Sequence, residues 1–312
     1  MIALIVRRTG LTLLTMLVVS VLLFLIFETR IDSIALSVLG PYTTVEQREI
    51  WLEANGYYDP LWQRYLRWLG NALTGDFGTS VQFKRPVNEV LWPRLGNTAL
   101  LGAVAMAVII PLSLLLGVLA GMREGSVRDR AISFVSILTT SVPEFASAMF
   151  LIGIFAVALD NLLPGTTNVA DGISLRELIL PAAVLVLYDF GYVARMTRAS
   201  MAEVMGTQYI RTAILKGLPY RRVILRHALR NALIPPFTVI MLQFNWLLSG
   251  VIVVEVAFAY KGFGYLLLEA ASNDDIYVIQ ACTMVAVLVA VATQTISDIG
   301  YGFLNPRIRF GR

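Results

Sequence analysis

Long apolar runs alternate with polar segments along the chain, and six of the runs are long enough to be membrane-spanning helices. A spanning helix needs about 20 predominantly apolar residues. The six predicted spans lie at residues 9–27, within 95–122, at 131–159, at 178–194, within 231–260 and at 276–297. The pattern therefore predicts an all-α, polytopic membrane protein with six transmembrane helices.

Composition supports a membrane class and excludes some chemistry. The chain is 57% hydrophobic and 15% charged, whereas soluble domains carry roughly 25% charged residues. Its single cysteine, Cys282, allows neither an intrachain disulfide nor a multi-cysteine metal cluster. The first apolar run follows Arg7 and Arg8, so a cleaved signal peptide is the alternative to a retained anchor. The run is longer than a typical signal-peptide core and no Ala-x-Ala-like site follows, which favours the anchor.

The distribution of basic residues predicts the orientation. With a cytoplasmic N-terminus, 16 of the 25 Lys and Arg residues fall in cytoplasmic segments, eight of them between spans 4 and 5. Each of the two short outer loops holds one, Arg176 or Lys261. The positive-inside rule then predicts that both termini are cytoplasmic. The reversed orientation would place the loop with eight basic residues outside.

The same reading divides the chain into three parts. Residues 1–29 hold the first span, residues 30–97 form an extracytoplasmic segment, and residues 98–312 form a five-helix core with a cytoplasmic coupling loop at 195–232. In the outer segment, residues 44–73 predict two amphipathic helices, separated by Asn55-Gly56 and Asp59-Pro60. Four of the five Trp lie in the outer segment. They indicate either helices lying at the lipid headgroups or a docking surface for an external protein.

A basic stretch between the fourth and fifth spans predicts a helix, a break and a second helix. Residues 209–236 read YIRTAILKGLPYRRVILRHALRNALIPP and hold seven basic side chains, counting His227. Pro219 cannot continue the first helix but suits the first turn of a second one. Ala213 and Gly217 are four residues apart, which leaves room for another surface.

Three functions fit such a stretch: helices on an anionic membrane surface, nucleic-acid binding, and insertion into a groove of a soluble partner. Nucleic-acid binding is disfavoured, because no aromatic residues alternate with the basic ones. The other two remain open on the residues alone.

The stretch resembles the EAA loop of importer-type ABC transporter permeases, in the dipeptide, oligopeptide and nickel subfamily. The resemblance rests on Arg211-Thr212-Ala213 followed by Gly217, and the chain departs from the usual pattern at Ile214 and Leu215. Five further segments resemble the family in order: GDFGTS at 75–80, SVPEF at 141–145, ARMTRASMAEV at 194–204, LSGVIVVEVAFAYKGFG at 248–264 and LNPRIR at 304–309. Nearly the whole chain is covered.

The resemblance implies a type I ABC importer permease in the cytoplasmic (inner) membrane of a bacterium or archaeon. Its implied partners are the lipid bilayer, a second homologous permease subunit, two cytoplasmic ATPase subunits and an extracytoplasmic solute-binding protein. ATP and Mg would be bound by the ATPases, since this chain has no GxxxxGK[ST] motif, no cofactor and no catalytic role of its own. The subfamily's solutes are mainly peptides, with nickel, glutathione and oligosaccharides as alternatives.

Two sets of site residues follow. The loop, residues 203–232, is expected to contact an ATPase through Tyr209, Ile210, Arg211, Thr212, Ala213, Lys216, Gly217 and Leu218. Ionisable side chains are costly in lipid and are expected to face protein or a water-filled cavity. The candidates for the translocation pathway or gate are Glu144, Asp189, Gln243, Asn245, Trp246 and Glu255.

Other interpretations remain open at these positions. Glu144 follows Pro143, so its role could be helix packing. His227 is the only histidine, and no metal site is expected. A channel or secondary transporter is the rival class, but such folds usually show inverted repeats and none is found here.

Overall fold

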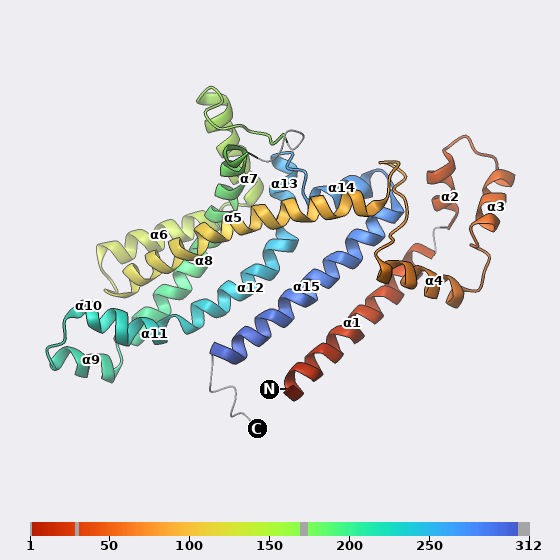
Figure 1. The fold of residues 1–312 in the computed structure, drawn as a ribbon. Coiled ribbons are helices and arrows are strands. Elements are labelled where there is room, and N and C mark those ends of the chain that lie inside the picture. Colours follow the sequence, from red (N-terminus) through yellow and green to blue (C-terminus); the bar gives the residue numbers. More distant parts are fainter. Residues whose placement is uncertain (1, 29–30, 169–173, 305–312) are drawn as a thin grey trace. The chain divides into compact units, whose positions relative to one another are not determined.

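The computed structural model describes residues 2–28, 31–168 and 174–304 (Figure 1). Only the backbone is described at residues 2–8, 32–33, 244–250 and 298–304. The described residues are mostly helical and contain no β-strand beyond an isolated bridge between Thr79 and Pro86. The predicted all-α class is confirmed. Two compact units emerge, one of residues 1–98 and 261–295, the other of residues 99–260 and 296–312.

The first unit combines the N-terminal part with a late hairpin. Its helices are α1 (Ile2–Glu28), α2 (Ile31–Leu39), α3 (Val45–Ala54), α4 (Leu61–Thr74), the start of α5 (Val87–Gly121), α14 (Phe263–Ser272) and most of α15 (Ile276–Leu304). Apolar side chains of α5, α14 and α15 form its main hydrophobic cluster, around Leu91, Leu266 and Cys282. These buried contacts explain why a segment far along the sequence joins the N-terminal part.

Local signals set the two outer helices. Thr44 caps α3 in a capping box with Gln47, and α4 follows Pro60 and ends at Gly75, whose φ is +82°. The two helices predicted between residues 44 and 73 are thus confirmed. The additional helix α2 was not predicted.

Aromatic and charged contacts hold α4 against α1. Trp68 and Tyr65 pack against Phe24, with ring centroids 5.9 and 5.5 Å apart. Arg64 forms an ion pair with Glu28 at the end of α1. Not every tryptophan is packed in this way, because Trp62 is exposed. Whether Trp62 meets lipid or a binding protein stays a prediction.

The second unit is organised around α8. Its helices are the end of α5, α6 (Val127–Ser141), α7 (Glu144–Ile152), the π-helical η1 (Gly153–Ala158), α8 (Leu175–Met205), α9 (Gln208–Leu215), α10 (Tyr220–Arg222), the π-helical η3 (Val223–Ala228), α11 (Leu229–Ala232), α12 (Ile234–Gly250) and α13 (Ile252–Ala257). Helix α8 packs against α6, α7, α11 and α12. Of the apolar stretch of α8, 61% is buried, against 33% for α5, so α8 is the central helix of this unit.

The predicted spans are confirmed only in part. Four described helices are long and apolar enough to cross a membrane: residues 9–28 of α1, α5, α8 and residues 276–297 of α15. The predicted fifth span is divided into α12 and the short α13, which meet at Val251. Six spans and the orientation of the termini remain predictions.

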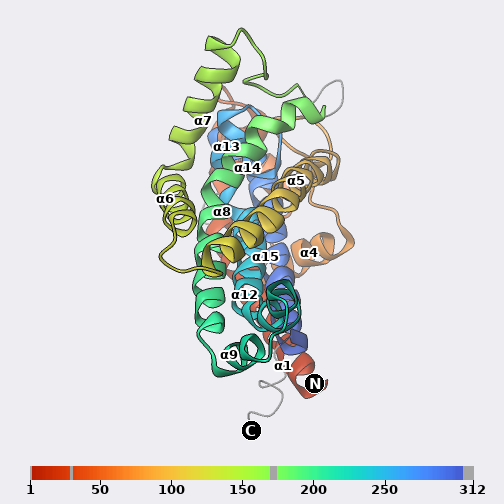
Figure 2. The ribbon, with the colours of Figure 1, turned by 90° about the vertical axis from the view of Figure 1, so that its left-hand side faces the viewer.

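The predicted third span is not one straight helix. Helix α6 and the pair α7–η1 meet at 97° (Figures 1 and 2). Pro143 disfavours a helical conformation at the preceding residue, and Val142 is indeed extended with ψ 124°. The apolar run at 131–159 does not reveal this bend, because hydropathy does not depend on the direction of the backbone.

Candidate functional site

The loop after α8 has the predicted helix–break–helix form, with the break at Gly217. Gly217 N–H donates to the Ile214 carbonyl at 2.9 Å, and Leu218 N–H donates to the Ala213 carbonyl at 3.3 Å. With φ +74° at Gly217, this is a Schellman end to α9. Pro219 then starts the next helical segment, made of α10, η3 and α11.

One face of α9 belongs to the chain's own core. Ile210 is fully buried and Ala213 is 7% exposed. They pack with Met201 of α8 and with Val223 and Ala228 of η3. Packing within the chain therefore explains why the side chain of Ala213 is small. The sequence pattern had been interpreted differently, as leaving room at Ala213 for another surface.

The opposite face of α9 is open. Of the eight residues expected to couple to an ATPase, five are exposed, Leu218 is half-buried, and Ile210 and Ala213 are buried; the exposed five are Tyr209, Arg211, Thr212, Lys216 and Gly217. The structure adds Leu215, which is 80% exposed, and Leu225 of η3, which is 69% exposed. Leu215 lies four residues after Arg211 and therefore on the same face of α9. An apolar residue on this basic face is the sequence signal that could have identified Leu215.

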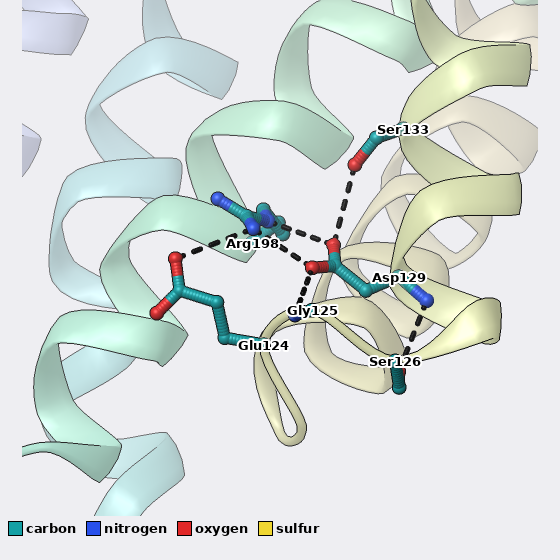
Figure 3. Close-up of polar contacts among 6 residues, drawn as sticks. All are labelled: Glu124, Gly125, Ser126, Asp129, Ser133 and Arg198. Atoms are coloured by element: carbon teal, nitrogen blue, oxygen red, sulfur yellow. Dashed lines mark hydrogen bonds and ion pairs between the residues drawn. The ribbon is translucent and has the colours of Figure 1, made fainter.

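A partly buried ion pair ties α8 to the first turn of α6, and Glu124 of the preceding loop lies close to the same arginine (Figure 3). Arg198 of α8 donates through Nε and Nη2 to the two carboxylate oxygens of Asp129, both at 2.8 Å. Asp129 also accepts from the Gly125 N–H at 2.8 Å and from the Ser133 hydroxyl at 3.3 Å, while Glu124 lies 3.4 Å from Arg198 Nη2. Asp129 is 3% exposed.

A bidentate ion pair of this kind fixes the relative orientation of the two side chains as well as the distance between them. It holds α8 just before the helix enters the coupling loop. Sequence reasoning missed this pair: Ser126 followed by Asp129 marks a helix start, but nothing local identifies Arg198, 69 residues away.

The second candidate site is a cavity of about 240 Å³ between α6, α8 and α12. It is lined by Thr140, Tyr188, Asp189, Tyr192, Arg195 and Gln243. Asp189 is 2% exposed. Its Oδ1 accepts from Gln243 Nε2 at 2.5 Å, and its Oδ2 has no hydrogen-bond partner among the described residues.

The cavity unites two of the six predicted pathway residues, Asp189 and Gln243. Glu144, at the start of α7, is half-buried and interacts electrostatically with Asp189 without lining the cavity. Glu255 is fully buried in α13 and is not a lining residue. The side chains of Asn245 and Trp246 lie outside the described residues.

Four lining residues were not predicted, and three of them share α8 with Asp189. Tyr188, Tyr192 and Arg195 lie at positions −1, +3 and +6 from Asp189, which is one face of a helix. That spacing of polar residues in an apolar run was the signal available for them. Elsewhere in the described chain, no group of three or more His, Cys, Asp or Glu residues lies close enough to hold a metal ion.

Comparison with known proteins identifies relatives along nearly the whole chain. Residues 113–310 match the family described as "Binding-protein-dependent transport system inner membrane component". The oligopeptide transport system permease protein AppB of Bacillus subtilis (strain 168) is 36% identical over 316 residues, which cover 99% of this chain and 100% of that protein. The dipeptide transport system permease protein DppB of Escherichia coli (strain K12) is 33% identical over 337 residues, 99% of each chain.

A solved structure shares the fold. The match is to a crystal structure of an amino acid ABC transporter with histidines, at a TM-score of 0.51 and 13% identity, over 68% of this chain and 93% of that one. At this identity the likeness concerns the fold alone.

Proposed function

The chain belongs to the family of binding-protein-dependent transport system inner membrane components, and from that premise we propose that it carries peptide-like solutes through the bacterial or archaeal inner membrane. It is an integral membrane protein, a permease subunit of an ABC transporter. The observation that carries the peptide assignment is similarity over 99% of the chain to permeases named for oligopeptides and dipeptides.

In the proposed mechanism the exposed face of α9 docks on a cytoplasmic ATPase subunit. Leu215 and Tyr209 supply apolar contacts, and Arg211 and Lys216 supply charge. ATP and Mg are bound by the ATPases, a second permease subunit completes the pathway, and a solute-binding protein delivers the solute from outside.

Helix α8 connects the two sites. It carries Asp189 in the cavity and leads directly into α9. Through Arg198, the same helix is tied to Asp129 of α6 and to Glu124 of the α5–α6 loop. A movement imposed on α9 by ATPase closure is thus passed to α5, α6 and α8 together, which shifts the population between inward-facing and outward-facing states.

The proposal is tested by reconstitution in liposomes. The chain, its partner permease, the ATPases and the binding protein are expected to take up dialanine only with ATP, and dialanine is expected to stimulate ATP hydrolysis. Uptake of dialanine by the permease subunits without the ATPases would instead identify a channel or secondary transporter.

Topology is tested by cysteine labelling in a Cys282→Ala background. Both termini are proposed to be cytoplasmic, with six crossings, so Ser272→Cys is expected to react with an impermeant reagent in intact cells. Val127→Cys is expected to react only after permeabilisation. Val127 is preferred to Ser126 because it is 85% exposed, whereas Ser126 caps α6. The reverse labelling pattern would refute the orientation.

A further inference from the structure

The cavity between α6, α8 and α12 holds a carboxylate whose hydrogen bonding is incomplete. Building on the proposed function, we propose that this cavity is a solute-recognition site in which Asp189 pairs with the protonated amino group of a peptide-like solute. The class of ligand is a primary ammonium on a molecule that also carries a carboxylate.

Asp189 is a buried carboxylate, and only one of its two oxygens accepts a hydrogen bond from a described residue. Its side chain is 2% exposed, and only Oδ1 has a described partner, Gln243. A buried carboxylate oxygen without a hydrogen bond is costly. A ligand that brings both N–H donors and a positive charge offsets that cost, because charge-assisted hydrogen bonds are the strong ones. The nearby carboxylate of Glu144 adds to the negative potential at Asp189.

The rest of the lining suits an organic ammonium better than a metal ion. Hard cations take about six to eight oxygen ligands, but the cavity offers one carboxylate and also contains the guanidinium of Arg195. No group of three or more metal-binding side chains occurs among the described residues. Tyr188 and Tyr192 supply aromatic rings beside Asp189, and such rings attract organic cations.

The volume of the cavity and the charge of Arg195 suit one end of a short solute that carries both an ammonium and a carboxylate group. A cavity of about 240 Å³ is below the usual range for drug-sized ligands, about 300–1,000 Å³, so it suits one end of a solute. Arg195 disfavours a plain cation and favours a solute that also carries a carboxylate. A short peptide with free termini has both groups.

The experiment compares two probes in the complete reconstituted importer, dialanine and N-acetyl-dialanine, which lacks the ammonium. Asp189→Asn keeps an oxygen that accepts from Gln243 and removes only the charge. Asp160→Asn is the matched control, since it makes the same change at an exposed position of the same unit, outside both the cavity and the coupling loop. All variants receive the same binding protein, so any selectivity of that protein cancels in the comparison.

The readout is the ratio of dialanine uptake to N-acetyl-dialanine uptake. Asp189→Asn is expected to lower this ratio about tenfold or more through loss of a charge-assisted contact, whereas Asp160→Asn is expected to keep the wild-type ratio. Asp189→Glu, which keeps the carboxylate, is expected to retain the preference for the free amine.

Several results would overturn the inference. An unchanged ratio in Asp189→Asn would make Asp189 a structural residue. An equal fall of the ratio in Asp160→Asn would mean that the net charge of the protein, and not the cavity, causes the effect. If the Asp189→Asn importer does not assemble, the Asp189→Glu importer provides the test. Equal uptake of dialanine and N-acetyl-dialanine by Asp189→Glu would also overturn the inference. Equal uptake of both peptides by the wild-type importer would contradict this inference and leave the proposed function standing. Uptake of neither peptide would contradict the proposed peptide function as well.

Discussion

Gly217→Val is expected to abolish solute uptake while the protein still inserts into the membrane, whereas Gly217→Asn is expected to keep most of the uptake. Gly217 has φ +74°, a conformation that costs most L-residues about 1–2 kcal/mol. Asn tolerates it far better than a β-branched residue does. A Cβ at this position would meet no atom within 4 Å, so within the chain the difference between the variants is conformational. Loss of the Schellman end of α9 would reorient the exposed face that we assign to the ATPase.

The measurement is dialanine uptake together with co-purification of the ATPase subunits. Lys216→Ala is the neighbouring control, and it is expected to change little because exposed ion pairs are worth roughly 0–1 kcal/mol. Normal uptake by the valine variant would contradict the prediction. If the asparagine and valine variants both lose uptake, a partner surface approaches Gly217 closely, which is the role that the sequence pattern assigned to it.

Gly117→Ala is expected to destabilise the second unit and to lower the yield of folded protein. A Cβ on Gly117 would lie 2.4 Å from Thr197 Cβ and 2.5 Å from the Ala194 carbonyl oxygen of α8. Gly121, four residues on, approaches the Arg198 carbonyl as closely, at 2.5 Å. This is the small-xxx-small contact of membrane helices. Overpacking such a contact costs roughly 1–3 kcal/mol.

The measurement is the apparent thermal transition of the detergent-solubilised importer. Gly96→Ala is the control on the same helix, because a Cβ there meets nothing within 4 Å. Since alanine is the better helix former, by about 1 kcal/mol, this control is expected to be neutral or stabilising. Equal transitions for Gly117→Ala and the wild type would show that α5 and α8 do not meet in this way.

Local signals in the sequence predicted a good part of the fold. Apolar runs located the helices now seen as α1, α5, α8 and α15, and Asn55-Gly56 and Asp59-Pro60 separated α3 from α4. Gly217 and Pro219 marked the break in the coupling loop. The GxxxG spacing of Gly117 and Gly121 was not singled out, and only the structure shows that α8 is the helix that these glycines meet.

The candidate sites were predicted less completely, because their parts come from different helices. Asp189 and Gln243 were singled out as ionisable or polar residues in apolar runs, but their hydrogen bond joins positions 54 residues apart. Glu144 and Glu255 carried the same signal, yet neither lines the cavity. The cost of a buried charge indicates that a partner exists and does not say which helix provides it.

By itself, then, the sequence determined the helical class, the membrane setting, the family and the break in the coupling loop. All of these depend on transfer free energies, on the backbone limits of glycine and proline, or on residues in a recognisable order. Tertiary structure alone decided the inward face of α9 with Ile210 and Ala213 and the pairing of Asp129 with Arg198. These features arise from packing between segments distant in the chain, and neither hydropathy nor helical periodicity specifies which faces will meet.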